Sequence, residues 1–469
     1  MRGSRAATYE MDLLHGPIFG KIMAFVLPLM LTNMLQSLYN AADMIIVGLS
    51  GVDGAIGAIG TTAAMVAMVI NLFAGFAVGA NIMVARAIGE GNRKKADDAV
   101  HTSMAVSIIS SLITMTTGLF ISRPLLAALG DQGHILELAT LYTRIYFLGN
   151  PFIAATNFFI SIFRAKGDTR TPLMVLTGTG ILNVLLNLVF VLGFGMSVDG
   201  VALATLISNL VSMLILGSLL HKDNGFCHFE LRKIRIEKYA LKGIIYNGLP
   251  AGVQGALFSL SNMLIQSSII GINNTTCPGG SDVIDGNAAG GNIESFAYVA
   301  ANSVTQAAVT FTSQHYGARS TKRIGKVIAN CYLASFLVCE VVSIVILLSK
   351  SFLIGLYSLT PVAASVAETR LKVMLSVYLT LGLMDTGSGL VRGMNRSSIS
   401  TIVSLLGSCV LRIIWIYTVV AAHPSLVLVY LSYPISWTIT GLCHLTVTLS
   451  LKKKFVRLAG VPAEEEPAA

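Results

Sequence analysis

Charged residues are scarce in this sequence. Asp, Glu, Lys and Arg make up 12% of the 469 residues, hydrophobic residues make up 54%, and the mean hydropathy is +0.74. Soluble globular domains carry about 25% charged residues. The composition therefore excludes a soluble protein and indicates a chain that lies mostly in lipid.

Cysteine is sparse as well, and the six cysteines do not form the pattern of a disulfide framework. Cys277 alone falls in a predicted outer loop, whereas Cys227 is predicted to be cytoplasmic. The other four lie in or near apolar segments, where a free thiol packs as a small hydrophobic group. We predict no disulfide bridge.

Motifs of enzymes and metal sites are missing. The sequence has no G-x-x-x-x-G-K-[ST] phosphate loop, and its eight histidines are scattered without metal-ligand spacing. ATP hydrolysis by this chain is therefore not indicated. We expect a protein that is not an enzyme and that carries no cofactor.

Long apolar segments recur from one end of the chain to the other. About 20 helical residues cross the hydrocarbon core of a bilayer, so each segment is a candidate transmembrane helix. The segments are 21–48, 57–84, 99–122, 139–163, 173–194, 200–220, 244–271, 288–314, 326–349, 368–391, 399–421 and 425–450. The predicted fold is an all-α membrane protein with twelve transmembrane helices.

The positions of Lys and Arg predict the orientation in the membrane. Most of the 32 basic residues lie in the N-terminal segment 1–20, in the tail 451–469 and in alternate connections between the apolar segments. Short basic connections stay in the cytoplasm, so we expect both termini to be cytoplasmic. The net charge of +9 then reflects topology, and no nucleic-acid partner is expected.

A polar connection at 221–243 divides the twelve segments into six and six. Superposing the two halves pairs Gly89 with Gly317 and Arg164 with Arg392. Units with an even number of spans share one orientation, as in parallel-repeat transporters. We therefore predict two six-helix bundles related by a parallel pseudo-two-fold axis. They are an N-lobe at 21–220 and a C-lobe at 244–450, joined by a cytoplasmic linker. A single compact bundle is the alternative.

The first apolar segment carries a stripe of polar residues. Asn33, Gln36, Asn40 and Asp43 fall within an arc of about 80° on a helix. Such a stripe cannot face acyl chains, because buried polar groups need partners. The alternatives are hydrogen bonding between packed helices and a solvated pathway, which the ionisable Asp43 favours. Pro28 is the predicted bend point of this long helix.

Further polar residues of the first half complement Asp43. Asn183 and Asn187 are four residues apart in the fifth segment, and Thr205 and Asn209 repeat this spacing in the sixth. Asn157 lies in the fourth segment. Each alone is typical of contacts between helices, but together they predict one polar site in an apolar lobe.

The second half carries different charged residues. Glu294 lies in the eighth segment, Asp385 in the tenth and Arg412 in the eleventh. Asp385 and Arg412 either form a buried ion pair or serve in transport. Glu340, alone in the ninth segment, supports no assignment.

Together, these motifs resemble those of bacterial MATE multidrug exporters. They are LP-x14-D in the first segment, GEGN after the second, FRAKGDTRTP after the fourth, and LNVLLNLVFVLGFGMSVDGVALAT across the fifth and sixth. The resemblance covers the chain from about residue 12 to residue 450 and implies two lobes that open alternately to the two sides. It also implies export of amphipathic or cationic compounds in exchange for protons or sodium.

The resemblance also assigns roles to individual residues. Asp43 matches the family's carboxylate in the first helix, and Pro28 matches the proline about which that helix bends. Asn183 and Thr205 match positions around the ion site of the N-lobe. Three further residues match positions that line the cavity in the family: Gln36, Tyr39 and Asn157.

Two departures from the family pattern concern charge. Relatives of the DinF branch, to which we expect this chain to be closer than to the NorM branch, often have Asp at the position of Asn187. The Glu expected in the seventh helix of NorM-like proteins is missing from LPAGVQGALFSLSN. The choice between a proton and sodium therefore stays open. Glu294 and Asp385 are candidates for charge in the C-lobe.

We thus predict a secondary antiporter with Asp43, Asn183, Asn187 and Thr205 at the ion-coupling site. The predicted substrate cavity comprises Asn33, Gln36, Tyr39, Asn40, Asn157, Asn209, Glu294 and Asp385. Two alternatives are a lipid-linked oligosaccharide flippase of the same superfamily and a membrane-embedded enzyme or receptor. We expect a monomer in the bacterial inner membrane.

Overall fold

The computed structural model describes residues 9–52, 54–128, 133–277 and 280–459. The far ends of the predicted N-terminal segment and tail, residues 1–8 and 460–469, lie outside the described residues. All six cysteines belong to the described part and are free thiols.

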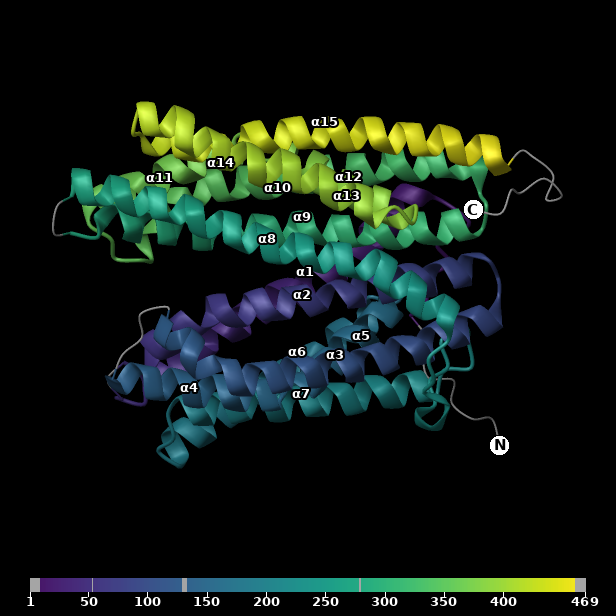
Figure 1. The fold of residues 1–469 in the computed structure, drawn as a ribbon, viewed down its shortest axis with the longest axis horizontal. Coiled ribbons are helices and arrows are strands. Elements are labelled where there is room, and N and C mark those ends of the chain that lie inside the picture. Colours follow the sequence, from purple (N-terminus) through teal and green to yellow (C-terminus); the bar gives the residue numbers. More distant parts are fainter. Residues whose placement is uncertain (1–8, 53, 129–132, 278–279, 460–469) are drawn as a thin grey trace. The chain divides into compact units, whose positions relative to one another are not determined.

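The first half of the chain forms seven α-helices (Figure 1). They are α1 (Ile18–Gly48), α2 (Ala55–Gly89), α3 (Arg93–Ala128), α4 (Gly133–Leu148), α5 (Asn150–Ala165), α6 (Arg170–Leu188) and α7 (Val198–His221), and a π-helical turn, η1 (Val189–Gly193), extends α6. A short 3-10 helix, η2 (Leu231–Lys233), lies in the connection to the second half.

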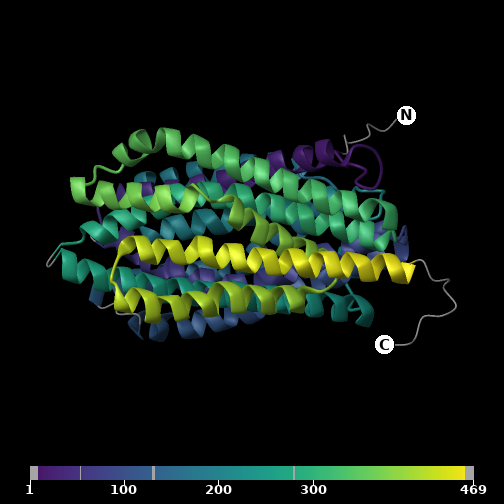
Figure 2. The same cartoon turned by 90° about the horizontal axis from the view of Figure 1, so that it is seen from above.

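The second half repeats this order of elements. Its α-helices are α8 (Lys238–Thr276), α9 (Asp282–Gly317), α10 (Thr321–Gly355), α11 (Pro361–Leu375), α12 (Leu379–Gly393), α13 (Ser397–Ser404), α14 (Leu411–Trp415) and α15 (Leu426–Ala459). Two π-helical turns, η3 (Leu405–Val410) and η4 (Ile416–Val420), flank α14. The last helix, α15, is the long yellow helix in Figure 2.

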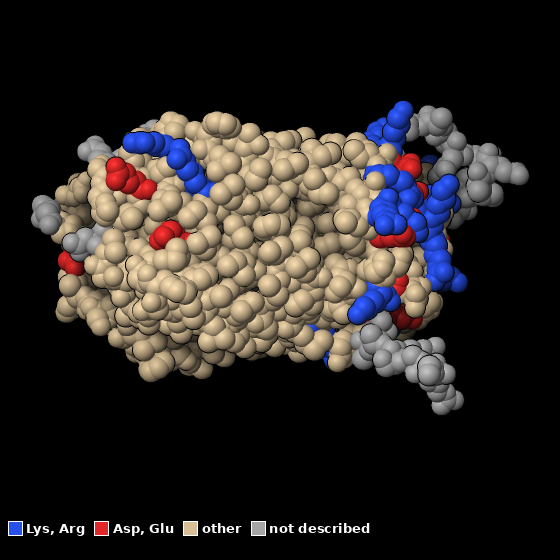
Figure 3. Space-filling view, turned by 90° about the horizontal axis from the view of Figure 1, so that it is seen from below, with Lys and Arg blue, Asp and Glu red and all other residues tan. Residues whose placement is uncertain are grey.

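Most of the predicted membrane spans meet a test of helix length and hydropathy in the structure. Within the described residues, eight helices are long and apolar enough to cross a membrane, and two bent pairs raise the number to 10. The two further predicted spans coincide with the long helices α2 and α9, which are not among these 10. Figure 3 shows one face of the molecule, on which most Lys and Arg side chains gather at one end of the helices. The middle of this face carries few charged side chains and is suited to contact with acyl chains.

The two halves share particular irregularities. In the first half α4 and α5 are bent by 50° and make the fourth span, and in the second half α11 and α12 are bent by 54° and make the tenth. The fifth and eleventh spans both contain π-helical turns. Such matching interruptions are expected of a structural repeat.

Packing divides the chain into two compact units. The first comprises 1–13 and 27–256, and the second comprises 14–26 and 257–469. The division therefore crosses α1 one residue before its helical Pro28. The predicted lobes, 21–220 and 244–450, divide the chain by topology instead and stay a prediction.

The connection between α7 and α8 is fixed to the first unit by charged contacts. Lys166 donates to Asp223 over 2.8 Å, and both side chains are buried, 4% and 5% exposed. Arg235 forms ion pairs with Asp97 and Asp98 at the start of α3. These ion pairs therefore hold the connection against the helices of the first unit.

Candidate functional site

The predicted polar residues of the first half surround one cavity inside the first unit. Its volume is about 330 Å³, within the range of small-molecule pockets. Its walls come from α1, α4, α5, α6 and α7, with one residue of α2. The lining residues are Gln36, Tyr39, Asn40, Asp43, Ile70, Tyr142, Tyr146, Ile153, Thr156, Asn157, Leu176, Thr179, Gly180, Asn183, Thr205, Ser208, Asn209 and Ser212.

Asp43 is the acidic residue among these lining residues. It is 9% exposed, and its Oδ1 accepts a hydrogen bond of 2.5 Å from Nδ2 of Asn187. Nδ2 of Asn187 also lies 3.3 Å from Oδ1 of Asn183, and Nδ2 of Asn183 donates to the Thr205 hydroxyl over 3.4 Å. The carboxylate thus ends a chain of side-chain hydrogen bonds that leads from α1 through α6 to α7.

The amide oxygen of Asn187 has no hydrogen-bond partner among the residues that the structure describes, although the residue is fully buried, 0% exposed. An unsatisfied buried acceptor costs about 1–3 kcal/mol, so such an atom needs an explanation. A cation beside Asp43 would satisfy this oxygen. A protonated Asp43 carboxyl group could also donate to it, if the side-chain amide of Asn187 flips so that its oxygen faces Asp43. Asn187 therefore contributes to the site from behind the cavity wall.

The structure brings most of the predicted site residues together. Those that line the cavity are Gln36, Tyr39, Asn40, Asp43, Asn157, Asn183, Thr205 and Asn209. Asn187 contacts Asp43 without lining the cavity. Asn33 and Pro28 are not part of the lining. The carbonyl oxygen of Pro28 accepts a hydrogen bond of 2.8 Å from the Thr32 hydroxyl.

Sequence reasoning missed several residues of the wall. Tyr142 and Tyr146 of α4 stack with ring centroids 6.1 Å apart, and their spacing of four residues in LYTRIYF was the available signal. The hydroxyls of Thr179 and Ser212 join α6 to α7 over 2.7 Å. The cavity therefore offers aromatic faces and hydroxyls in addition to the predicted amides.

A glycine allows α1 and α6 to approach each other at the cavity. A Cβ at Gly180 would lie only 1.9 Å from the Tyr39 ring, whose hydroxyl donates to the carbonyl of Thr177 over 3.3 Å. Because the ring lies against the bare backbone of α6, a side chain at this position must displace Tyr39.

We therefore expect Gly180→Ala to move Tyr39 and to weaken binding of a substrate in the cavity. Overpacking of this kind costs typically about 1–3 kcal/mol. Dye binding and thermal unfolding of the purified protein would measure both effects. Gly178→Ala, two residues away on the same helix, has open space around the added methyl group and is the control. Equal behaviour of the two variants would contradict this explanation.

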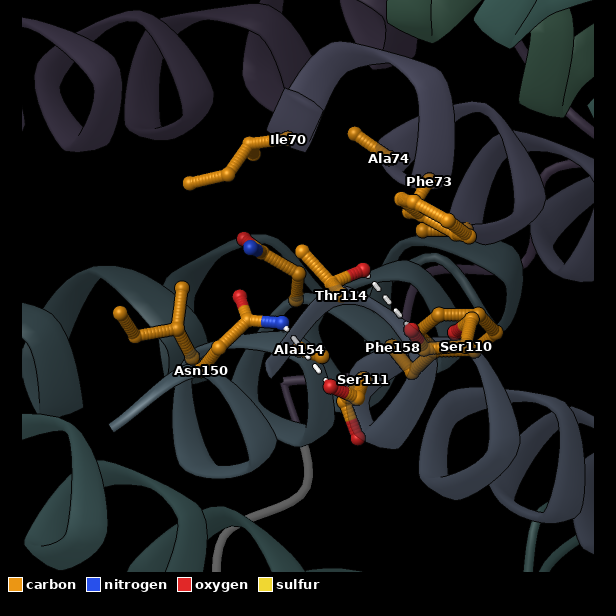
Figure 4. A pocket seen from close by; sticks show the side chains of 12 residues that line it. Ile70, Phe73, Ala74, Ser110, Ser111, Thr114, Asn150, Ala154 and Phe158 are labelled. Atoms are coloured by element: carbon orange, nitrogen blue, oxygen red, sulfur yellow. Dashed lines mark hydrogen bonds between the residues drawn. The ribbon is translucent and has the colours of Figure 1, made fainter. Parts of the chain in front are cut away.

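A second, smaller cavity of about 30 Å³ lies beside the first and shares Ile70, Ile153 and Asn157 with it. In Figure 4, Asn150 donates to the Ser111 carbonyl and Thr114 to the Ser110 carbonyl. A site for one water needs about 10–15 Å³ and polar partners. The smaller cavity therefore has room for water but not for an organic substrate.

Charged residues of the second half have partners that the sequence analysis did not name. Glu294 forms an ion pair with Arg370 over 2.8 Å, and Arg370 also donates to the Asn287 side chain over 2.6 Å. Nε of Arg412 donates to Ser436 over 2.7 Å. The sequence missed Arg370 as a partner, and the roles predicted for Glu294 and Asp385 in the substrate cavity stay predictions.

Arg412 and Asp385 do not form the direct ion pair that was one of the two alternatives. Within the described residues, Arg412 has no carboxylate oxygen within ion-pair distance, and its guanidinium instead lies 4.3 Å from the centre of the Tyr433 ring and 5.8 Å from that of Trp437. Aromatic faces attract cations, so these rings take the place of a counter-ion. Among all the residues that the structure describes, in both halves, no group of three or more His, Cys, Asp or Glu side chains is placed to hold a metal ion.

Comparison with models of known protein families identifies the family of this chain. The MatE family model matches residues 28–189 and 250–418, one match in each half. The chain belongs to the MATE family. Its members include multidrug efflux transporters, so the family supports a transporter rather than an enzyme.

Curated relatives of this MATE protein carry the names of multidrug resistance proteins. The probable multidrug resistance protein NorM of Thermotoga maritima is 26% identical over 380 residues, 80% of this chain and 79% of that protein. The probable multidrug resistance protein YoeA of Bacillus subtilis is 24% identical over 397 residues, 83% and 84% of the two chains. The predicted place near the DinF branch stays a prediction.

Solved MATE structures share the whole fold. One, described as the outward-facing conformation of a multidrug resistance MATE family transporter of the MOP superfamily, has a TM-score of 0.85 and 23% identity over 97% of this chain and 100% of that one. Another, MATE in the straight conformation, has a TM-score of 0.87 and 22% identity over 96% and 99%. The predicted all-α fold with twelve helices in two bundles is confirmed.

Proposed function

We propose that this MATE protein is a secondary antiporter that exports amphipathic or cationic small molecules. The exchanged ion, a proton or sodium, binds at Asp43 with the help of Asn183, Asn187 and Thr205. The observation that carries the proposal is the position of Asp43, whose carboxylate lines a cavity and ends a hydrogen-bond chain. Intramembrane carboxylates in such positions mark ion and proton routes.

The charge of Asp43 is the switch in this proposal. Ionised, the carboxylate carries a desolvation cost and attracts a cation, whether the coupling ion or a cationic substrate. Neutralised by the coupling ion, it loses its attraction for the substrate and tolerates burial. The two ligands therefore compete for one carboxylate, which is the requirement for exchange rather than for co-transport.

Pro28 supplies the movable element. Proline removes a backbone hydrogen bond within a helix and favours a bend, and α1 passes from one compact unit to the other beside Pro28. We propose that α1 bends there when the ion binds and narrows the cavity. Since Asp43 and Pro28 lie on the same helix, occupancy of the ion site acts directly on the bend.

The lining chemistry supports the substrate class. Tyr39, Tyr142 and Tyr146 offer aromatic faces, which attract organic cations, and Asp43 offers a negative charge. The amides and hydroxyls around them bind polar groups of varied shape. Relatives named as multidrug resistance and multidrug export proteins agree with such a cavity.

A lipid-linked oligosaccharide flippase is the rival within the superfamily. Its pyrophosphate substrate requires cationic residues, but the cavity contains no Lys or Arg among its described lining residues. A membrane-embedded enzyme or receptor would be expected to lack the repeat of six and six helices. Both alternatives are therefore disfavoured by features of this chain.

The remaining parts of the proposal concern the setting. We place the protein in a bacterial inner membrane with cytoplasmic termini, because the basic connections lie on that side. We propose that it acts as a monomer, that its partners are small-molecule substrates and the bilayer, and that it requires no cofactor beyond the coupling ion.

Transport in proteoliposomes tests the proposal. Vesicles with the full chain are loaded with the amphipathic cation ethidium, and a proton gradient and a sodium gradient are imposed in separate experiments without ATP. One gradient should drive ethidium movement, and an ionophore that collapses this gradient should stop it. An ethidium transport rate that is the same with and without each of the two gradients would refute antiport.

A further inference from the structure

A second large cavity lies on the first unit, away from the ion-coupling site. Its volume is about 760 Å³, and its walls come from α3, α5, α7 and the connection at 229–234. Among the described residues, none lines both this cavity and the cavity around Asp43. The proposed transport cycle gives this second cavity, here called the linker groove, no role.

The linker groove runs along the helices from their linker end toward the middle of the membrane. It follows α7 from His221 back to Met213 and α3 from Met104 to Leu112. Eight residues of helix correspond to about 12 Å. The groove is thus an elongated slot within one leaflet of the bilayer.

The deep part of the linker groove is apolar and opens toward lipid. Its floor includes the buried ring of Phe159, and exposed side chains at its sides include Leu112, 46% exposed, and Leu214, 58% exposed. In a membrane span, exposed leucines face acyl chains. The slot is therefore accessible from the bilayer.

The roof of the linker groove is fixed in place. The Phe229 ring packs edge-on against Phe159 with centroids 5.2 Å apart, and the backbone N–H of Glu230 donates to Nε2 of His101 over 3.2 Å. Arg235 ties the end of the connection to the start of α3 through its ion pairs with Asp97 and Asp98. The roof is therefore already formed before a ligand arrives, and binding costs little ordering.

The mouth of the linker groove carries one uncompensated positive charge. Glu230 is neutralised by Lys233 over 2.6 Å, and this exposed contact lowers the pKa of Glu230. Arg232 lines the mouth, is exposed, and forms no ion pair or hydrogen bond with any residue that the structure describes. Its guanidinium is free to bind a phosphate, for which its planar fork is well shaped.

We infer that the linker groove binds one anionic phospholipid of the adjacent leaflet, with an acyl chain in the apolar slot and the lipid phosphate group on Arg232. The polarity of the slot matches that of a lipid in its normal orientation, because the charged mouth lies at the linker end and the apolar depth toward the membrane centre. Basic residues at this level attract anionic lipids. The site would keep the linker and the first unit together.

Native mass spectrometry of the full chain in detergent tests this inference. After removal of native lipid, the protein is titrated with phosphatidylglycerol and, separately, with phosphatidylcholine of the same acyl chains. We expect a retained adduct with phosphatidylglycerol at about fivefold lower concentration, the preference that one basic residue near the surface supplies.

Two variants assign the adduct to the linker groove. Arg232→Ala should remove the preference between the two lipids, and Ser218→Phe, which fills the groove from an exposed position on α7, should weaken binding of both. Lys454→Ala, an exposed basic residue on α15, is the matched control and should bind as the unmodified chain does.

Several results would overturn the inference. They are equal affinity for the two lipids in the unmodified chain, a preference for phosphatidylglycerol that survives Arg232→Ala, an adduct that survives Ser218→Phe unchanged, and displacement of the lipid by free inorganic phosphate. Displacement by ethidium would make the groove a substrate site and would also contradict a lipid site.

Discussion

Replacement of Asp43 by Asn should abolish ion-driven export while the protein still folds. The amide has nearly the size of the carboxyl group but cannot exchange a charge, so substrate and ion no longer compete for it. An ion gradient equivalent to 100 mV supplies about 2.3 kcal/mol per charge, which corresponds to roughly fifty-fold accumulation of substrate. In vesicles that contain the Asp43→Asn variant, the ion gradient should drive no accumulation of substrate.

The control for this prediction is the same substitution at another acid of the first unit. Asp199 lies in the first turn of α7 and accepts a hydrogen bond of 2.9 Å from the backbone N–H of Ser197, which an amide oxygen also accepts. Asp199→Asn should therefore leave accumulation unchanged. Retained accumulation in Asp43→Asn would disprove the role assigned to Asp43.

Replacement of Lys166 by Met should destabilise the first unit strongly. Lys166 and Asp223 form a buried ion pair, and removal of one partner leaves an uncompensated buried charge at a cost of about 3–5 kcal/mol. Burial alone would lower the pKa of Lys166, but its hydrogen bond and attraction to Asp223 raise it. The contribution of the Lys166 charge is therefore complete at neutral pH and is lost as the pH rises through the raised pKa of Lys166, above the ordinary lysine range.

Thermal unfolding in detergent should show the loss as a midpoint several degrees lower for Lys166→Met. The double variant Lys166→Met/Asp223→Asn should recover most of it, because the new amide would carry no charge yet keep an acceptor for the backbone N–H of Gly225, which Asp223 binds over 2.9 Å. A double variant as unstable as the single one would show that the charge pair is not the cause.

The twelve spans could be predicted because the thickness of the bilayer fixes the length of an apolar helix. The ends of the helices were harder to place. The seventh span was predicted at 244–271, whereas α8 runs from Lys238 to Thr276. Helices continue into the polar interface, where hydropathy no longer distinguishes a helical turn from a loop.

The polar wall of the site could be predicted in part. The stripe on the first helix follows from helical periodicity alone, and of its four members Gln36, Asn40 and Asp43 line the cavity whereas Asn33 does not. By contrast, the position of Tyr142 and Tyr146 beside this stripe depends on how α4 packs in the first unit. Their spacing predicts that the two rings stack on each other, but no local pattern specifies which distant segment they face.

The charges of the second half show the same limit. Glu294 and Arg370 are far apart in the sequence, and their ion pair exists because α9 packs against α11. An ion pair with Asp385 was one of two alternatives for Arg412, but the rings of Tyr433 and Trp437 lie against its guanidinium instead. Partners of buried charges therefore follow from packing rather than from order along the chain.

Ethidium binding to the purified chain at varied pH, and at varied sodium concentration, tests the central claim most directly. In the unmodified protein, ethidium affinity should fall as the coupling ion rises, and ethidium should weaken ion binding by the same factor, because linkage is reciprocal. In Asp43→Asn, ethidium affinity should no longer depend on that ion. The same ion dependence in both proteins would contradict exchange at Asp43.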